Sequence, residues 1–263
     1  MCLPEKTKPI RHAHLVAAAA NEECHVSEMS QRQTTFADLC RTFAFYAVSI
    51  VAAIPFVLVY PLVYVGVPVY RFGIAPYLRV QLWILKWAGG ITHRIEGWEN
   101  LPESPFIFAS QHQATWENLY FQLLLGNPAF FAKAEIFSYP LAGTIARKNG
   151  QIKVNRSGTV DELRSTLQQG LETLKTGRNV LIYPTGTRTA TSFETARHGI
   201  AVLYRKSNRP VVPIVLDSGK YWRLGTWIKH NGEIRVKILP PIHPGLSTDA
   251  FLRELHDALS ECV

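Results

Sequence analysis

The chain of 263 residues has little of several features that mark common protein classes. It holds four cysteines, and none of them forms the Cys-x-x-Cys pair that many zinc and redox sites use. Scattered cysteines predict free thiols in a reducing compartment. Charged residues make up 18% of the chain against 47% hydrophobic residues, which excludes a disordered polyelectrolyte. A chain of this length buries a large core, so folding requires neither a metal nor disulfides.

Two catalytic signatures are also missing. The Gly-Lys-Ser/Thr sequence of a Walker loop is absent, which argues against an NTPase. The Gly-x-Ser-x-Gly elbow of serine hydrolases is absent too, so no serine nucleophile is indicated. Residues 1–40 lack the hydrophobic core of a secretion signal, because their longest apolar run covers only residues 15–20. We expect residues 1–40 to form a polar N-terminal segment.

Basic residues exceed acidic ones, with 28 Lys and Arg against 20 Asp and Glu, and the formal net charge is +8. This excess favours an anionic partner, which is a nucleic acid, a membrane surface or a phosphorylated small molecule. No nucleic-acid recognition motif accompanies the charge, and nucleic-acid binding would leave a long apolar segment unexplained. We therefore expect no nucleic-acid partner.

That apolar segment follows the N-terminal residues. No residue from Thr42 to Tyr70 is charged, and an arginine flanks the segment on each side. A helix needs about 20 apolar residues to span a bilayer, so the segment is long enough for one crossing but not for two. Its prolines, which bend or end helices, are Pro55, Pro61 and Pro68. We predict a membrane-associated helical segment over residues 41–88, either as one kinked span or as a broken segment in one leaflet.

The last part of this segment has a different pattern. From Tyr77 to Ala88, apolar residues alternate with Arg79 and Lys86 in the manner of an amphipathic helix. Such a helix lies on lipid headgroups or packs its apolar face against a soluble domain, and the sequence fits both arrangements.

Residues 89–263 have the pattern of an α/β domain. Short apolar runs predict strands at 106–109, 180–183, 211–216 and 234–238. Residues 160–174 carry apolar side chains at helical spacing, with a capping box of Thr159 and Glu162 at the start and Gly177 after the end. Strands that alternate with helices predict a layered domain, in which helices flank a mostly parallel sheet.

One strand–helix junction carries a histidine and a carboxylate. His112 follows the strand at 106–109, and Glu117 lies at the start of the helix-like run 116–125. Successive helical residues are rotated by about 100°, so the two side chains meet only if His112 lies in the turn and Glu117 in the first helical turn. Glu117 would then fix the tautomer of the imidazole, whose other nitrogen accepts a proton. A surface histidine at a helix start is the alternative.

A second polar turn follows the strand at 180–183. Its sequence, Tyr-Pro-Thr-Gly-Thr-Arg, stands where α/β proteins bind ligands, at the end of a parallel strand. Thr185 and Thr187 offer hydroxyl groups, and the planar guanidinium of Arg188 suits phosphate. An ordinary solvated turn is the alternative.

Basic residues are frequent between positions 133 and 156, where the sequence has Lys133, Arg147, Lys148, Lys153 and Arg156. They form a basic face near anionic lipid, or one or two of them hold a substrate phosphate. Charge alone does not separate the two interpretations.

Together these segments resemble the glycerophospholipid acyltransferase family, in particular its bacterial 1-acylglycerol-3-phosphate acyltransferases. Residues 112–117 are similar to the family's first block, His-x-x-x-x-Asp, with Glu in place of Asp. Residues 150–156 resemble the second, Gly-x-x-Phe-Ile-x-Arg, with Lys in the Phe position. Residues 183–188 match the third, Phe-Pro-Glu-Gly-Thr-Arg, except that Thr185 replaces the glutamate. Residues 211–215 resemble the fourth, a strand with a central proline.

The resemblance implies transfer of a fatty acyl group from acyl-CoA or acyl carrier protein to the free hydroxyl of 1-acylglycerol-3-phosphate, giving phosphatidic acid. It implies His112 as the general base and Glu117 as the residue that orients it. It assigns substrate binding to Arg188, Arg156, Lys133, Thr185, Gly186, Thr187 and Arg197. No metal or organic cofactor is expected, because the acyl carrier is itself a substrate.

The resemblance also implies a location and leaves the acceptor open. Acyl carriers reside in the cytosol, so we expect the protein at the cell inner membrane, in contact with membrane lipids, with its catalytic domain facing the cytoplasm. Thr185 replaces a carboxylate that the family places near the acceptor's head group. Glycerol-3-phosphate or another lyso-lipid, such as lyso-ornithine lipid, is therefore the alternative acceptor. An inactive lipid-binding protein is a further alternative, against which the intact pair of His112 and Glu117 argues.

Overall fold

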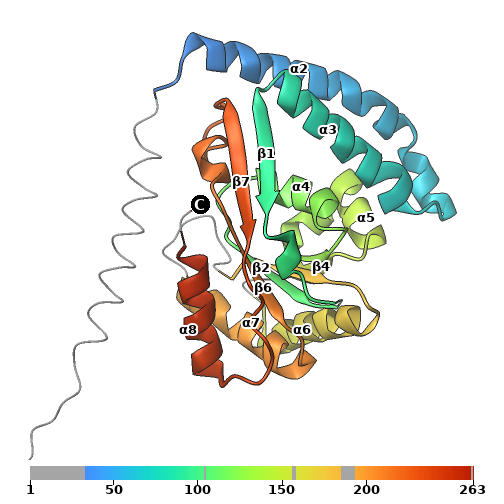
Figure 1. Cartoon of the computed structure of the whole chain (residues 1–263). Helices are drawn as coiled ribbons and strands as arrows, with labels where there is room; N and C mark the ends of the chain where they lie inside the picture. The colour runs from blue at the N-terminus through green and yellow to red at the C-terminus, as the bar shows by residue number, and fades with distance from the viewer. Residues whose placement is uncertain (1–32, 104, 156–157, 185–192, 262) are drawn as a thin grey trace, which may run out of the picture.

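The structure is a computed structural model, and it describes residues 33–103, 105–155, 158–184, 193–261 and 263. A seven-stranded sheet forms its centre (Figure 1). The strands are β1 (Ile91–Glu96), β2 (Ile107–Ser110), β3 (Ala129–Lys133), β4 (Ile152–Val154), β5 (Val180–Ile182), β6 (Val211–Leu216) and β7 (Gly232–Ile238). Their order is β1-β7-β6-β2-β5-β3-β4, and the described neighbours pair in parallel except for β6 and β7. The predicted mostly parallel sheet is confirmed.

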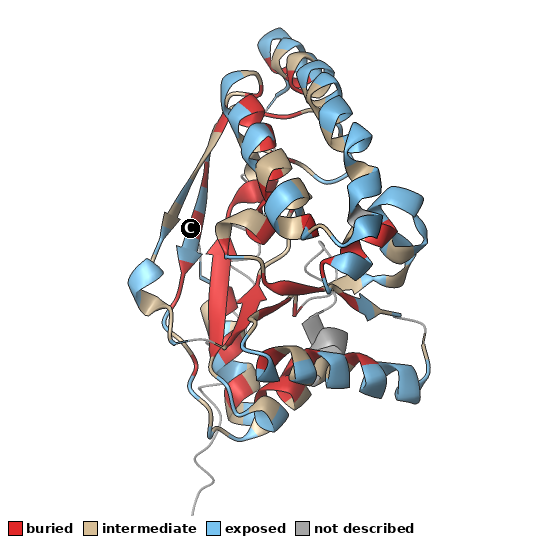
Figure 2. Ribbon diagram, turned by 90° about the vertical axis from the view of Figure 1, so that its right-hand side faces the viewer, coloured by how far each residue is buried: buried red, intermediate tan, exposed pale blue. Residues whose placement is uncertain are grey.

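Helices cover both faces of the sheet. The helices of the domain are α3 (Ala75–Trp87), α4 (Trp116–Leu124), α5 (Pro140–Lys148), α6 (Val160–Lys175), α7 (Phe193–Ser207) and α8 (Thr248–Leu259). Side chains of α3 and α4 join one hydrophobic cluster with the sheet, and side chains of α6, α7 and α8 join another. Strand β6 is buried along its whole length, as expected for a strand covered on both sides. Figure 2 shows the buried strands between the more exposed helices.

The local signals identify some elements and miss others. The helix predicted at 160–174 is α6, and both hydrogen bonds of its capping box are present. The four predicted strands correspond to β2, β5, β6 and β7. The sequence pattern does not predict β1, β3 and β4. Two of these strands, β1 and β4, have exposed polar side chains, and β4 is only three residues long.

Helix α2 (Phe36–Leu58) forms the first part of the predicted membrane segment. It begins before the uncharged stretch because Thr35 caps its first turn. Pro55 lies near its end, and the chain continues through the 3₁₀ turn η1 (Tyr60–Val65) and the π turn η2 (Tyr70–Ile74) into α3. The apolar segment is thus broken, and α2 and α3 lie side by side at one end of the molecule (Figure 1).

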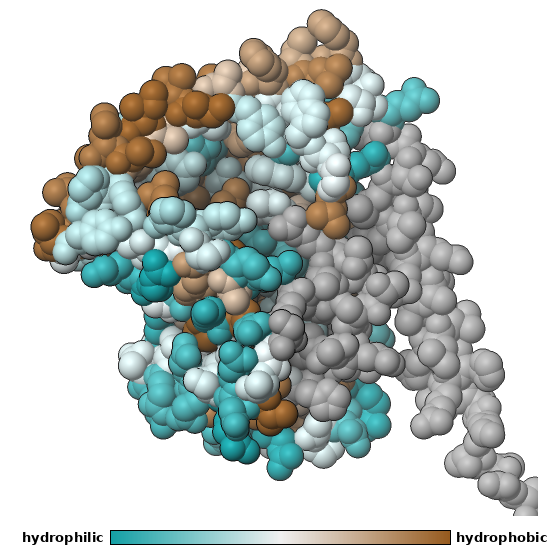
Figure 3. Space-filling view, turned by 180° about the vertical axis from the view of Figure 1, so that it is seen from behind, coloured by the Kyte–Doolittle hydropathy of each residue, from teal (hydrophilic) through white to brown (hydrophobic). Residues whose placement is uncertain are grey.

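Most of α2 is exposed. Among the described residues, α2 is the one helix whose length and apolar composition would allow it to cross a membrane. Only 11% of its most apolar 18-residue stretch is buried. Phe43 and Ile50 are among its exposed side chains. Figure 3 shows apolar side chains gathered on the surface at the end of the molecule where α2 lies. Such a patch indicates membrane association.

The first turns of α2 are nevertheless fixed to the α/β domain. Thr42 Oγ1 accepts a hydrogen bond from the Lys229 amide at 2.9 Å, and Asp38 Oδ2 lies 3.4 Å from Nδ1 of His230. The Lys229 ammonium donates to the Trp227 carbonyl at 2.7 Å, and burial lowers the pKa of Lys229 to about 8. Buried polar contacts of this kind hold α2 along the domain surface.

Candidate active site

His112 lies in the turn between β2 and α4, and Glu117 is the second residue of α4. The turn is attached to the sheet by Gln111, whose backbone amide donates to the Ile214 carbonyl at 3.0 Å. The Gln111 side chain accepts from the Leu216 amide, also at 3.0 Å. The positive end of the α4 dipole favours a carboxylate at this position. The junction therefore has the strand–turn–helix form that the sequence predicts.

The Glu117 carboxylate is fully buried and has four hydrogen-bond partners. Its Oε1 lies 2.9 Å from His112 Nδ1 and accepts from the amides of Gln113 and Ala114, both at 2.7 Å. Its Oε2 accepts from the Ser218 hydroxyl at 2.8 Å. These donors offset the desolvation of a buried charge. With a proton on Nδ1, the imidazole donates to Glu117, and Nε2 is then the basic nitrogen of the ring.

Residues after β6 form one side of the site. Strands β6 and β2 are parallel neighbours, so both chains leave the sheet at the same edge. The turn η6 (Ser218–Lys220) follows there, and the Gly219 amide donates to Gln113 Oε1 at 3.1 Å. The apolar run at 211–216 predicts the strand, but no motif in the sequence points to Ser218 or to the half-buried Lys220. The available signal was a polar Asp-Ser-Gly run directly after a buried parallel strand.

The other neighbour of β2 is β5, and it contributes an aromatic ring. Tyr183 follows β5 and stacks on the His112 ring, with 4.2 Å between ring centroids and 20° between planes. The His112 side chain is 10% exposed. Stacking and the contact with Glu117 together fix the orientation of the imidazole.

The structure brings together His112 and Glu117 but describes few of the predicted substrate-binding residues. Arg156, Thr185, Gly186, Thr187 and Arg188 lie outside the described residues. Arg197 belongs to α7, but its side chain is also outside them. Lys133 is described: it ends β3 and is exposed at the carboxyl end of this strand.

Two other basic residues between positions 133 and 156, Arg147 and Lys153, lie in different surroundings. The Arg147 guanidinium donates to the Phe137 carbonyl at 2.6 Å, which uses one of its nitrogens within the protein. Lys153 is exposed on β4, the last strand of the sheet. Its exposure leaves its ammonium accessible to an anion.

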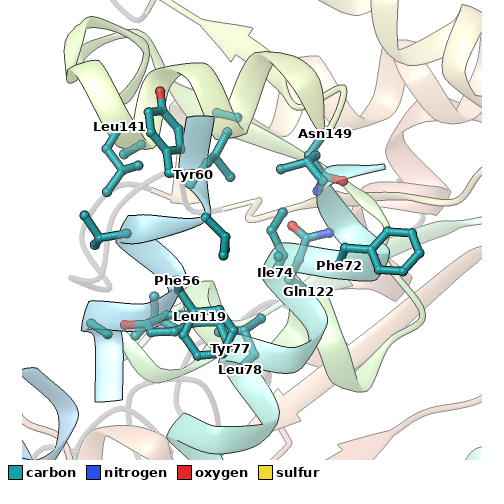
Figure 4. A pocket seen from close by; sticks show the side chains of 18 of the residues that line it. Phe56, Tyr60, Phe72, Ile74, Tyr77, Leu78, Leu119, Gln122, Leu141 and Asn149 are labelled. Atoms are coloured by element: carbon teal, nitrogen blue, oxygen red, sulfur yellow. The ribbon is translucent and has the colours of Figure 1, made fainter. Parts of the chain in front are cut away.

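An apolar cavity of about 470 Å³ lies between the α2–α3 segment and helices α4 and α5 (Figure 4). Its walls include Phe56, Tyr77 and Leu119. Asn118, the neighbour of Glu117 in α4, also lines it. The cavity has the size of a small-molecule site, and its lining suits a hydrocarbon chain.

The site pairs a histidine with a buried carboxylate. In such an arrangement an imidazole can take a proton from a hydroxyl group. Among the described residues, no group of three or more His, Cys, Asp or Glu side chains is placed to hold a metal ion.

Comparisons with known proteins agree on one family. A family model described as Acyltransferase matches residues 92–217. The 1-acyl-sn-glycerol-3-phosphate acyltransferase of Pseudomonas aeruginosa is 33% identical over 176 residues, which cover 66% of this chain and 68% of that protein. The lyso-ornithine lipid O-acyltransferase of the same bacterium is 26% identical over 196 residues, with coverage of 67% and 75%. The chain spans about half the length of two chloroplast relatives that it also matches.

A solved structure shares the fold. The crystal structure of the 1-acyl-sn-glycerophosphate acyltransferase from Thermotoga maritima superposes with a TM-score of 0.62 at 22% sequence identity. The match covers 85% of this chain and 93% of that one. From the family model, the relatives and the shared fold, we conclude that the chain belongs to the acyltransferase family and is an enzyme that transfers acyl groups.

Proposed function

We propose that the enzyme transfers a fatty acyl group from acyl-CoA or acyl carrier protein to the free hydroxyl of 1-acylglycerol-3-phosphate and forms phosphatidic acid. The observation that carries this proposal is the contact of 2.9 Å between His112 Nδ1 and the buried Glu117 carboxylate. The Pseudomonas aeruginosa relative, whose name states the same activity, supports the choice of acceptor.

The proposed reaction needs one base and no protein nucleophile. The acceptor hydroxyl attacks the thioester carbonyl as His112 Nε2 takes its proton. Glu117 stabilises the imidazolium that forms. When the tetrahedral intermediate collapses, the new ester forms, the carbon–sulfur bond breaks and the proton passes from the imidazolium to the leaving thiolate.

We propose that basic residues bind the acceptor phosphate. Arg188 and Arg156 are the main candidates because a guanidinium binds phosphate through two hydrogen bonds. Lys133 and Arg197 are further candidates. The turn residues Thr185, Gly186 and Thr187 would contact the acceptor's head group. Neither a metal nor an organic cofactor takes part in this proposal.

The apolar cavity is the proposed site for the acyl chain. Asn118 and Leu119 of α4, the helix that carries Glu117, contribute to its walls, and its apolar lining suits a hydrocarbon chain. The polar side chains of Gln122, Asn149 and Gln151 also line the cavity, and Gln151 Nε2 donates to Gln122 Oε1 at 2.8 Å. These amides are polar and bonded to each other, so they would limit how deep a hydrocarbon enters.

Filling the cavity is expected to change chain-length preference. In the variant Ala142→Phe, a larger side chain would occupy space at the α5 wall. We expect the ratio of kcat/KM for stearoyl over lauroyl thioester to fall about tenfold, which corresponds to about two lost methylene contacts. Competition assays with the two thioesters measure the ratio. Ala250→Phe, on α8 and away from the cavity, is the control and should leave it unchanged; an unchanged ratio in Ala142→Phe would contradict the assignment.

A second acceptor has specific support. Thr185 stands where the family has a glutamate, and one relative is named a lyso-ornithine lipid O-acyltransferase. Full-length enzyme assayed with lysophosphatidic acid, glycerol-3-phosphate and lyso-ornithine lipid, each with acyl-CoA and with acyl carrier protein, separates these acceptors. We expect the highest kcat/KM with lysophosphatidic acid. A higher value with lyso-ornithine lipid would select the alternative, and absence of product with every acceptor would overturn the proposed activity.

We further propose that α2 and α3 attach the enzyme to the cytoplasmic face of the inner membrane. The first turns of α2 are fixed to the domain, and the outer face of α3 exposes Trp83, Trp87, Arg79 and Lys86. Indole rings and cationic side chains suit an interface of anionic headgroups. The broken segment with one exposed apolar side favours insertion into one leaflet over a crossing.

Removal of the two indole rings is expected to weaken membrane binding. The double variant Trp83→Ser/Trp87→Ser should bind vesicles of phosphatidylcholine and phosphatidylglycerol at least about tenfold more weakly, because the rings no longer bury apolar area among lipids. Vesicle flotation measures the partition coefficient. Trp98→Ser removes an indole that is 45% exposed outside the α2–α3 face and should bind like the wild type. Equal binding of the double variant and the control would exclude α3 from the interface.

A further inference from the structure

The second oxygen of Glu117 has a partner that the proposed reaction does not use. Oε1 faces His112, whereas Oε2 accepts a hydrogen bond of 2.8 Å from the Ser218 hydroxyl. Both side chains are fully buried. The residues are 101 positions apart in sequence, so the contact depends on the pairing of β2 with β6.

We propose that Ser218 is a positioning residue that acts through Glu117, and that its hydroxyl holds the carboxylate in the orientation in which it contacts His112. The inference rests on the proposed function of His112 as the base. It adds a residue from the turn η6 to the pair at the junction of β2 and α4.

The hydrogen bonds explain how the hydroxyl acts. The donors on Oε1, which are His112 and the amides of Gln113 and Ala114, all come from the turn before α4. They restrain the carboxylate from one side only. Ser218 holds Oε2 from the β6 side and adds a restraint on the carboxylate plane from a second element. The lone pairs of Oε1 then stay directed at His112 Nδ1, which keeps the imidazole in its reactive orientation.

The Ser218 position is itself firmly held. The neighbouring Asp217 accepts from the Arg235 amide at 2.7 Å, and its own amide donates to the Arg235 carbonyl at 3.2 Å. On the other side, the Gly219 amide donates to Gln113 Oε1 at 3.1 Å. The turn after β6 is therefore bonded to β7 and to the His112 turn, and the hydroxyl has a fixed place.

The length of the side chain follows from these contacts. Glu117 reaches back to the amides of Gln113 and Ala114 and across to Ser218 at the same time. An aspartate is one methylene shorter, so on the same backbone it would lose contact on one of the two sides. The side-chain length of Glu117 therefore suits the position of the Ser218 hydroxyl.

The test compares Ser218→Ala in two backgrounds. In the wild-type background we expect kcat to fall about tenfold, the effect of losing one hydrogen bond to a charged group, with little change in KM for either substrate. In the Glu117→Ala background the same substitution should change kcat less than twofold, because no carboxylate remains to be positioned. Ser218→Cys, which is similar in size but a poor donor, should match Ser218→Ala in the wild-type background.

Tyr204→Phe is the matched control. It removes another buried hydroxyl, which donates to the His243 carbonyl at 2.6 Å between α7 and the segment before α8. It should lower thermal stability without lowering kcat. Wild-type kcat in Ser218→Ala, or an equal loss in both backgrounds, would overturn the role of Ser218. Either outcome would leave the proposed function intact, provided that His112→Ala is inactive. An active His112→Ala variant would instead contradict the assignment of His112 as the general base.

Discussion

Replacing His112 with alanine is expected to lower kcat by at least about 10²-fold, because general-base assistance of this kind contributes at least that much to the rate. The proposed acceptor is an aliphatic alcohol that must lose its proton as it attacks, and His112 Nδ1 lies 2.9 Å from the buried Glu117 carboxylate. The KM values should change little, since His112 acts on the reacting proton. Initial rates of phosphatidic acid formation over a range of both substrates measure the effect.

A second histidine in a similar setting provides the control. His93 on β1 packs against the Trp116 ring with 5.8 Å between centroids, and burial lowers its pKa. Like His112 it is an imidazole packed on an aromatic ring, but it lies outside the proposed catalytic pair. His93→Ala should therefore keep a kcat near that of the wild type. If His112→Ala turned over at the rate of His93→Ala, the assignment of the base would be wrong.

The parts of the site that are close in sequence could be predicted from the sequence. His112 and Glu117 meet within one strand–turn–helix junction, and the limited reach of five residues leaves one geometry for their contact. The helix α6 is equally local, because its capping box and its apolar spacing lie within one segment. Such features need no knowledge of which strands pair.

The parts that depend on strand order could not be predicted in the same way. Ser218 reaches Glu117 only because β6 pairs with β2, although 101 positions separate the two residues. The apolar cavity likewise needs walls from α2, α3, α4 and α5, whose packing no local pattern reveals. The antiparallel pairing of β7 with β6 is a further example, since the alternating pattern of β7 shows a strand but not its direction.

Replacing Glu117 with glutamine is the second substitution with a large expected effect. Glutamine has nearly the same shape, and its carbonyl still accepts from the amides of Gln113 and Ala114. It lacks the negative charge that stabilises the imidazolium, and its amide group competes with His112 as a donor. Loss of an orienting carboxylate leaves the base in the wrong tautomer, so we expect kcat to fall by about 10²- to 10⁴-fold with little change in KM.

The variant Glu117→Asp separates the effect of the negative charge from the effect of side-chain length. The aspartate keeps the charge, yet it is one methylene too short to contact both the His112 turn and Ser218 on the present backbone. We expect a loss of about tenfold, close to that of Ser218→Ala and far smaller than that of Glu117→Gln. Steady-state kcat of the three variants, with thermal melting to establish folding, gives the order. If Glu117→Gln retained the rate of Glu117→Asp, the negative charge would not matter, and His112 would not depend on a carboxylate.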